Sequence, residues 1–199
     1  MELIEKYGFS LERSGRGDVT IFNFEAKTKK IKQQISTHNL ILYSGADILA
    51  QCLAGTPGYK IAAMYIEYQN LASPTDPVVV PAFDRTGGIE YYNALGSSPN
   101  GDFLRVPLVT NPTVSSSNMT DYAGNVMSFF AMSEGTAGFF GRPFNASSNS
   151  AVLGAALVAT PDPDSQAEDV VFSRVYAGIG KVLVATGFNV GVVWGIQFS

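Results

Sequence analysis

The chain has 199 residues, of which 46% are hydrophobic and only 15% are charged, with a formal net charge of −4. Globular chains carry about 25% charged residues, so this chain is poor in charge. No apolar run reaches the roughly 18 residues of a membrane helix, which disfavours a membrane partner. The single Cys and single His argue against a disulfide scaffold and an acid–base enzyme. The acidic balance disfavours nucleic acid as a partner.

The charges are distributed unevenly along the chain. Residues 1–39 hold seven basic and five acidic side chains, whereas residues 40–199 hold six basic and twelve acidic ones. A soluble monomer normally carries mixed surface charge, and the cores of subunit interfaces are depleted in charge. We therefore expect the long, charge-poor segment to bury surface against other copies of itself or a larger assembly.

The first predicted elements are two strands around a polar turn. Residues 19–25 and 30–36 alternate in hydrophobicity, and residues 26–29 between them are polar. This pattern predicts a hairpin that extends from the body as an N-terminal arm. The expected organisation is an arm at residues 1–38 and a body at residues 39–199.

The segment SGADILAQCLAG predicts a short helix. Ser44 is expected to cap its N-terminus, with Asp47 at the capping-box spacing. Ile48, Leu49, Cys52 and Leu53 would form one buried apolar face, with Cys52 as a small core residue, and the following Gly55 would end the helix.

The rest of the chain predicts short strands and long loops. The segment at 59–69 is apolar on both faces, which indicates a strand that is covered on both sides. Pro107 places the strand at 103–109 at a sheet edge or a bulge. Residues 110–124 lack periodicity and predict a loop. Further strands are expected at 125–133, 150–160, 169–177, 181–186 and 189–198.

The last of these strands has the clearest alternation. Val190, Val192, Trp194 and Ile196 share one face, and small residues occupy much of the other, which predicts a half-buried strand. Together, the elements indicate an all-β fold with one short helix: an antiparallel β-sandwich or jelly-roll-like body.

No residue pattern predicts catalysis, a cofactor or a metal centre. His38, the only histidine, lies at the predicted junction of arm and helix, where we expect it to cap a turn. The acidic segment 162–169 departs from calcium-loop spacing, so a solvated turn is preferred over a Ca²⁺ site.

Two sets of residues are candidates for binding a partner. The lysine-rich turn either binds an acidic partner surface or prevents the edge of a sheet from pairing with strands of other molecules. The large aromatic residues supply core or interface anchors. The pair Tyr91-Tyr92, with the Phe129-Phe130 and Phe139-Phe140 doublets, is the alternative candidate for a sugar-binding platform. The candidates are Lys27, Lys29, Lys30, Lys32, Tyr65, Tyr91, Tyr92 and Trp194.

Five segments follow one another along the chain: NLILYSGADILAQCLAG (39–55), DRTGGIEYYNAL (84–95), FLRVPL (103–108), VFSRVYA (171–177) and VGVVWGIQFS (190–199). In this order they resemble the small virion structural proteins of tailed bacteriophages, especially capsid decoration, or cement, proteins. The resemblance spans nearly the whole chain and implies a β-sandwich or jelly-roll body without catalytic residues. It also implies a homo-oligomer, with a trimer favoured over a dimer, on the outside of an icosahedral shell.

The expected role is therefore a non-enzymatic decoration protein that binds the major capsid protein and clamps neighbouring capsomers. Its expected location is the capsid surface of the virion, after synthesis in the host cytoplasm, because the N-terminus lacks a secretory apolar region. The alternative is a tail, fibre or baseplate component that binds host-surface glycans. A hydrolase is disfavoured by the single histidine.

Overall fold

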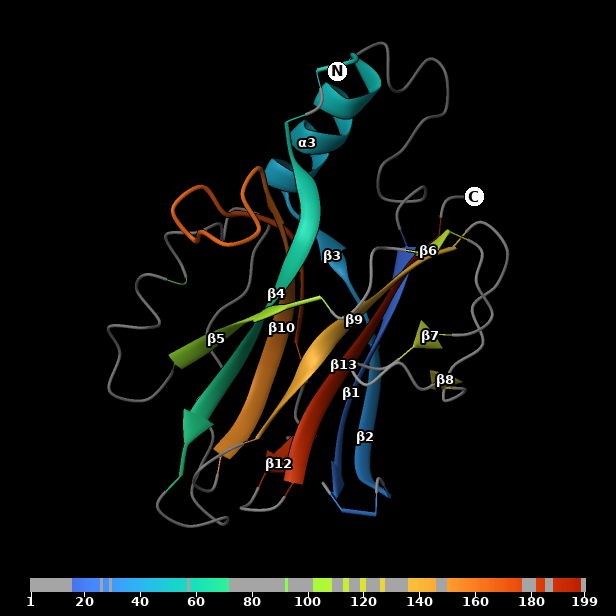
Figure 1. The fold of residues 1–199 in the computed structure, drawn as a ribbon, viewed down its shortest axis with the longest axis vertical. Helices are drawn as coiled ribbons and strands as arrows, with labels where there is room; N and C mark the ends of the chain where they lie inside the picture. The colour runs from blue at the N-terminus through green and yellow to red at the C-terminus, as the bar shows by residue number, and fades with distance from the viewer. Residues whose placement is uncertain are drawn as a thin grey trace.

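The protein folds as two facing antiparallel sheets with a helix at one end of the long axis (Figure 1). This arrangement, seen in the computed structural model, confirms the prediction of an all-β sandwich with one helix. The structure describes residues 16–25, 27–28, 30–56, 58–71, 92, 102–108, 113–114, 119–120, 126–127, 136–145, 150–176, 182–184 and 188–197.

Each sheet combines strands from distant parts of the chain. The first sheet has the order β2-β1-β13-β9-β6 and the second has the order β3-β11-β10-β4-β5, with β12 also paired to β10. The first contains β1 (Arg16–Glu25), β2 (Ile31–His38), β6 (Thr113–Val114), β9 (Thr136–Asn145) and β13 (Phe188–Gln197). The second contains β3 (Leu40–Ile41), β4 (Lys60–Asn70), β5 (Asp102–Pro107), β10 (Ser150–Thr160), β11 (Val170–Tyr176) and β12 (Val182–Val184). Strands β7 (Met119–Thr120) and β8 (Val126–Met127) form a separate pair.

The predicted N-terminal hairpin is present, but it is not an extended arm. Strand β1 lies between β2 and β13 and pairs with β13 over ten residues. Val19 and Ile21 of β1 are fully buried in the main core. Their apolar inward face can be buried only against the second sheet, which is why the hairpin belongs to the sandwich.

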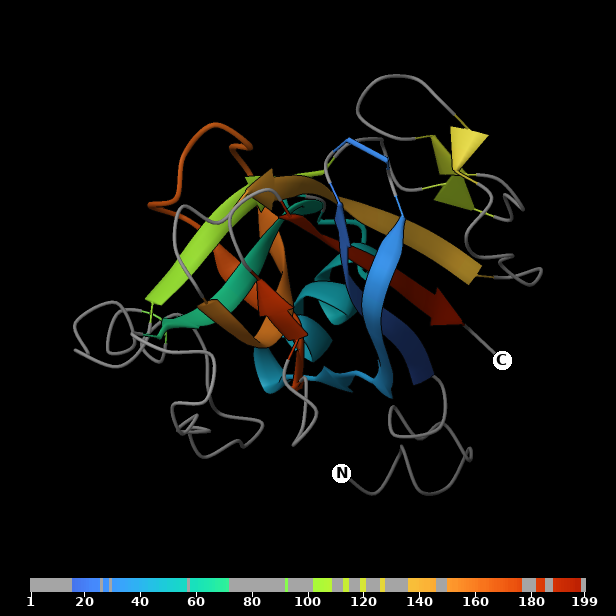
Figure 2. The ribbon, with the colours of Figure 1, turned by 90° about the horizontal axis from the view of Figure 1, so that it is seen from below.

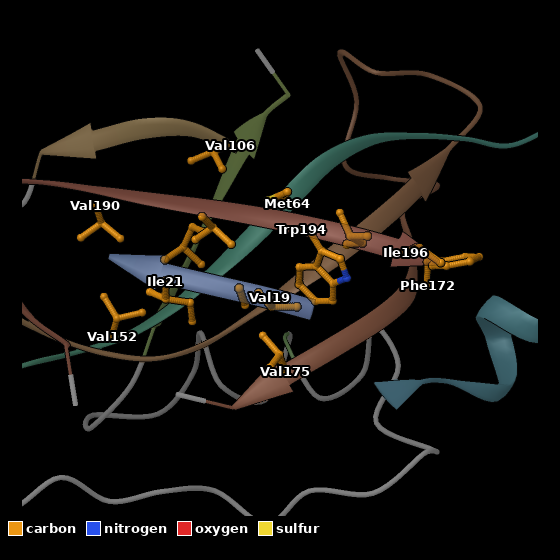
Figure 3. Close-up of a cluster of buried hydrophobic side chains, with 14 of the residues drawn as sticks. Val19, Ile21, Met64, Val106, Val152, Phe172, Val175, Val190, Trp194 and Ile196 are labelled. Atoms are coloured by element: carbon orange, nitrogen blue, oxygen red, sulfur yellow. The ribbon is translucent and has the colours of Figure 1, made fainter. Parts of the chain in front are cut away.

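The main core lies between the two sheets (Figure 3). From β13 it contains the four residues predicted to share a face, Val190, Val192, Trp194 and Ile196, which confirms that alternation. The opposite face of β13 was expected to be exposed, and this expectation is wrong. Val193 on that face is buried, and the Phe22 ring of β1 lies over Gly191, where a Cβ would come within 2.5 Å of the ring.

Strand β4 is covered on both sides, as predicted. Met64 and Ile66 contribute to the main core, whereas Ala63 and Tyr65 belong to a second cluster on the outer face of the sheet. Leu42, at the start of the helix, also belongs to this second cluster. The outer face of this sheet is therefore an apolar layer of its own.

The helix α3 (Tyr43–Leu53) ends as predicted but begins differently. The N-cap residue is Leu42, without a side-chain cap; Ser44 lies inside the helix and donates its hydroxyl to the Val171 carbonyl on β11. At the other end Gly55 adopts φ 77°, and the Thr56 and Gly55 amides bind the Gln51 and Cys52 carbonyls. These two bonds form a Schellman motif, which explains why the helix stops there.

Only the first half of α3 packs against the sandwich. Ile48 is buried and Leu49 is partly buried, but Cys52 is exposed and Leu53 is 84% exposed. The prediction that Cys52 lies in the core is therefore wrong. The helix projects beyond the ends of the sheets (Figure 1), so no strand lies close enough to cover its last turn.

A glycine allows the first turn of α3 to approach β11. A Cβ on Gly45 would collide with the carbonyl oxygen of Phe172, a backbone atom that cannot rotate away. Gly45→Ala is therefore expected to lower the free energy of unfolding by about 1–3 kcal/mol, the usual cost of overpacking. The matched control is Gly58→Ala, where an added Cβ meets nothing within 4 Å. Urea unfolding measures both; equal values for the two variants would contradict the close contact.

The remaining strand predictions have mixed outcomes. Strand β5 ends at Pro107 and is the edge strand of its sheet, as predicted. The predicted loop at 110–124 contains the two-residue strands β6 and β7, so it is not entirely irregular. Strand β9 was not predicted, because Gly138, Gly141 and Pro143 interrupt its pattern; it is stabilised by pairing along β13. Of the strand predicted at 125–133, only β8 lies within the described residues.

Candidate interaction surface

The most closely connected polar groups lie on the outer face of the second sheet. Arg174 of β11 binds Glu67 of β4 through two hydrogen bonds, Nε to Oε1 and Nη2 to Oε2, both of 2.7 Å. Both side chains are fully buried. The Tyr92 hydroxyl donates to Glu67 Oε1 at 2.6 Å, and the Arg174 guanidinium lies 5.7 Å from the centre of the Tyr92 ring. The result is a buried ion pair in a low-dielectric layer.

A second ion pair organises the acidic segment between β10 and β11. Arg105 of the edge strand β5 binds Asp169 through Nε at 2.7 Å and Nη2 at 3.1 Å. Its guanidinium also donates to the carbonyl oxygens of Pro163 and Ser165. The Tyr65 hydroxyl donates to the same Asp169 carboxylate at 2.7 Å. Asp169 is therefore occupied by Arg105 and Tyr65.

The acidic segment thus forms an ordered turn. Asp162 and Asp164 are joined by a hydrogen bond from the Asp164 amide to the Asp162 carboxylate. Within the described residues, no group of three or more His, Cys, Asp or Glu side chains could hold a metal ion. Arg105 pairs with one carboxylate of the turn, that of Asp169.

The tyrosines join the two ion pairs through their rings. Tyr65 packs against Tyr92 with ring centres 4.7 Å apart, and Phe103 contacts both rings, at 4.7 and 5.1 Å. Burial raises the pKa of Tyr65 well above its ordinary value, and its hydrogen bond to Asp169 raises it further. Hydrogen bonding to Asp169 also raises the pKa of Arg105. These groups are therefore held in one protonation state in the folded protein.

The pKa shift of Tyr65 predicts a loss of stability in alkali. A group whose pKa is raised by folding stabilises the protein below its unfolded pKa, about 10 for tyrosine, and loses that contribution as the pH rises towards the folded pKa. Between about pH 8 and pH 11.5, the free energy of unfolding should fall more steeply for the wild type than for Tyr65→Phe. Tyr43→Phe, at an exposed tyrosine, should keep the wild-type slope. Identical slopes for all three proteins would contradict the prediction.

Three of the predicted partner-binding residues are core residues instead. Tyr65, Tyr92 and Trp194 each have 0% exposure in the chain by itself, so their side chains cannot touch a partner. This corrects their assignment as partner-binding residues in favour of the core role that was also expected, and it removes Tyr92 from the predicted sugar-binding platform. Tyr91 lies outside the described residues, as do Phe129 and Phe130.

The lysines lie at the opposite end of the molecule from α3. Lys27, Lys30 and Lys32 are exposed around the turn that joins β1 to β2, and Lys29 lies outside the described residues. Figure 1 shows this turn at the bottom of the long axis and α3 at the top. Because β2 is the edge strand of its sheet, the lysines occupy the position that the edge-guarding interpretation requires.

His38, which we expected to cap a turn, is the last residue of β2 and is exposed. The neighbouring Asn39 makes the link between the sheets: its amide donates to the Gly17 carbonyl and its side chain donates to Ser173. The junction is thus held by Asn39.

The helix α3 exposes an apolar side chain at each end. Tyr43, its first residue, is 60% exposed, Leu53, its last residue, is 84% exposed, and Asp47 is the only charged residue of the helix. We call the exposed residues Cys52 and Leu53, at the projecting end, the α3 tip. Among the described residues, no helix is long and apolar enough to cross a membrane.

The two ion pairs were not predicted, although the sequence contained a signal for them. Glu67, Arg105 and Arg174 are isolated charges within apolar strands, and each faces the outer layer of the second sheet. A lone charge in a buried strand requires a partner of opposite sign. The strand order that brings β4 beside β10, and β10 beside β11, determines which partner it finds.

The chain was also compared with known proteins. A scan of protein-family models, a search of curated proteins and a search of solved structures found no match to this chain.

Proposed function

We propose that this chain is a non-enzymatic structural protein of a tailed-phage virion, a capsid decoration protein that binds the outside of the major capsid protein shell and clamps neighbouring capsomers. The observation that carries the proposal is the low charge of the body. Among the described residues of the body, the charged side chains Glu67, Asp169 and Arg174 are buried, which lowers the exposed charge below what the composition indicates. Such a surface suits burial in an assembly better than isolation in water.

The α3 tip is the proposed contact with the shell. Leu53 exposes a large apolar side chain at the end of the helix that projects from the sandwich, next to the exposed Cys52. An exposed apolar side chain at a projecting position is suited to a contact with another protein.

The proposed mechanism is stabilisation by binding. A protein that binds the assembled shell, and not the separated capsomers, stabilises the shell by mass action. Several copies linked as a homo-oligomer gain avidity, so each single contact can be weak. The exposed lysines, Lys27, Lys30 and Lys32, add favourable contacts with an acidic shell surface.

The test uses purified protein and undecorated capsids. We expect the protein to cosediment with the capsids and to raise their melting temperature. Leu53→Asp should weaken both effects, because it places a charge in the α3 tip. Leu104→Asp, at a residue 39% exposed on β5, makes the same change away from the tip and should leave binding intact.

No cosedimentation and no rise in capsid melting temperature would overturn the proposed role. A glycan array provides the complementary measurement. Binding to host polysaccharide without binding to capsids would replace the decoration role with that of a tail, fibre or baseplate component.

A further inference from the structure

The edge of the first sheet is formed by β2, a strand of eight residues. Strand β2 ends the sheet order and pairs with β1. Five of its side chains, including Gln34 and Ser36, are exposed. Figure 2 shows β2 (light blue) in front of β1, at the rim of the sandwich. A long, exposed edge strand is a template for pairing with another chain.

The devices that protect an edge strand occur only at one end of β2. Lys30 and Lys32 are exposed beside the turn, and the register shift at Asn23/Phe24 leaves Lys32 as a bulge. Lysines and bulges are the usual means of blocking edge pairing. The following residues, 33–37, contain no charge and no proline, and their register with β1 is regular. The guarded part of the edge is therefore short, and the larger part is suited to pairing.

The backbone of β2 alternates in direction. The Asn39 amide donates to the Gly17 carbonyl, so residue 39 points its hydrogen-bonding groups towards β1. In a regular antiparallel ladder, residues two apart share this direction. Ile35 and Thr37 therefore also face β1, whereas Gln34 and Ser36 direct their backbone N–H and C=O groups away from it, towards the edge at which no described strand pairs with β2.

We infer that β2 pairs antiparallel with β2 of a second copy of this chain, around a two-fold axis at Ile35. Gln34 of each copy would then exchange backbone hydrogen bonds with Ser36 of the other, joining the two first sheets into one continuous sheet. This contact forms a dimer, where the resemblance favours a trimer. The inference does not rest on the proposed virion role, because it concerns only the association of the chain with itself.

Charge selects the antiparallel arrangement. In a parallel pair, Lys32 of one copy would lie directly beside Lys32 of the other, and like charges directly opposite are destabilising. In the antiparallel pair centred on Ile35, the two lysines are six residues apart along the strand, about 20 Å. This distance is more than twice the Debye length of about 8 Å at physiological salt. Antiparallel pairing therefore carries no like-charge penalty.

Ile35 supplies apolar contact at the two-fold axis. It packs against the main core but is only partly buried. In the inferred dimer the two Ile35 residues face each other as a non-hydrogen-bonded pair, with Cα atoms about 4.5 Å apart. Each isoleucine would then cover the exposed part of the other.

The first experiment places a charge at the edge. Sedimentation velocity from micromolar to submillimolar concentration should show a dimer of the 21.2 kDa chain. Gln34→Lys should shift the equilibrium from dimer to monomer, because the two added lysines would lie near the two-fold axis and repel each other. Thr28→Lys adds the same charge at the exposed turn and should leave the dimer unchanged. A wild-type monomer throughout this range, or a dimer insensitive to Gln34→Lys, would overturn the inference.

The second experiment traps the contact covalently and tests its register. In a Cys52→Ser background, which removes the exposed native thiol, Ile35→Cys should form a disulfide-linked dimer under mild oxidation. The expected Cα separation of about 4.5 Å lies within the range of disulfide bonds. Thr28→Cys in the same background should remain monomeric on a non-reducing gel. Equal crosslinking of Ile35→Cys and Thr28→Cys, or no crosslinking of Ile35→Cys, would contradict the inferred pairing of the two β2 strands around Ile35. Circular dichroism of each variant verifies that it folds.

Discussion

Arg174→Met is expected to lower the free energy of unfolding by about 3–5 kcal/mol, the cost of breaking a buried ion pair by removing one partner. Arg174 and Glu67 are both fully buried and share two 2.7 Å hydrogen bonds. Without the guanidinium, the Glu67 carboxylate would remain in an apolar layer without its counter-charge. Urea unfolding followed by circular dichroism measures the loss.

The double variant Glu67→Gln/Arg174→Met tests the physical reason. It removes both charges and keeps an amide oxygen that can accept the Tyr92 hydroxyl, so it should be more stable than Arg174→Met. The control is Lys60→Met, which removes an exposed cation at the start of β4 and should have little effect. If the losses of unfolding free energy in Glu67→Gln and Arg174→Met add up to the loss in the double variant, the cost does not come from an unpaired buried charge.

Trp194→Ala is expected to cost about 3–5 kcal/mol, the usual range for truncating a buried aromatic side chain. Trp194 has no exposed surface and lies among Val19, Met64 and Val175 between the sheets (Figure 3). Its removal would leave a cavity between the sheets. The sheets cannot move together to close it, because hydrogen bonds between the strands hold each sheet in shape. Leu53→Ala, at a residue 84% exposed, is the control and should have little effect.

Trp194→Phe separates the contribution of packing from that of hydrogen bonding. Within the described part of the chain, the buried Trp194 Nε1 has no hydrogen-bond acceptor. Phenylalanine would remove this unsatisfied donor while filling most of the space, so its cost should be clearly below that of alanine. A Trp194→Phe variant as unstable as Trp194→Ala would show that the indole N–H is bound after all.

The elements with a clear local pattern were predictable from the sequence. Strand β13 alternates over its whole length, and its inward residues lie in the core as predicted. Strand β4 is apolar on both faces and is covered on both. Pro107, which cannot donate to a ladder, marked an edge strand. Gly55 marked the end of α3, because its positive φ suits a residue without a side chain.

The elements whose stability depends on distant partners were not predictable. Strand β9 contains residues that oppose strand formation, yet eight of its ten residues pair with β13. The hairpin was recognised, but its place inside the sheet was not, because the ten-residue pairing of β1 with β13 joins segments about 170 residues apart. Cys52 has the spacing of a core residue but lies where the helix has passed the end of the sheets.

The low charge illustrates the same division between sequence and structure. By itself, the sequence determined the fold class and showed that the body is poor in charge. Only the tertiary structure decided which charges in the described part of the body are buried, and that the paired charges Glu67 and Arg174 meet across β10. The physical reason is that alternation and turn residues act over a few neighbours. The partner of a buried charge or the neighbour of a strand depends instead on contacts between segments far apart in the chain.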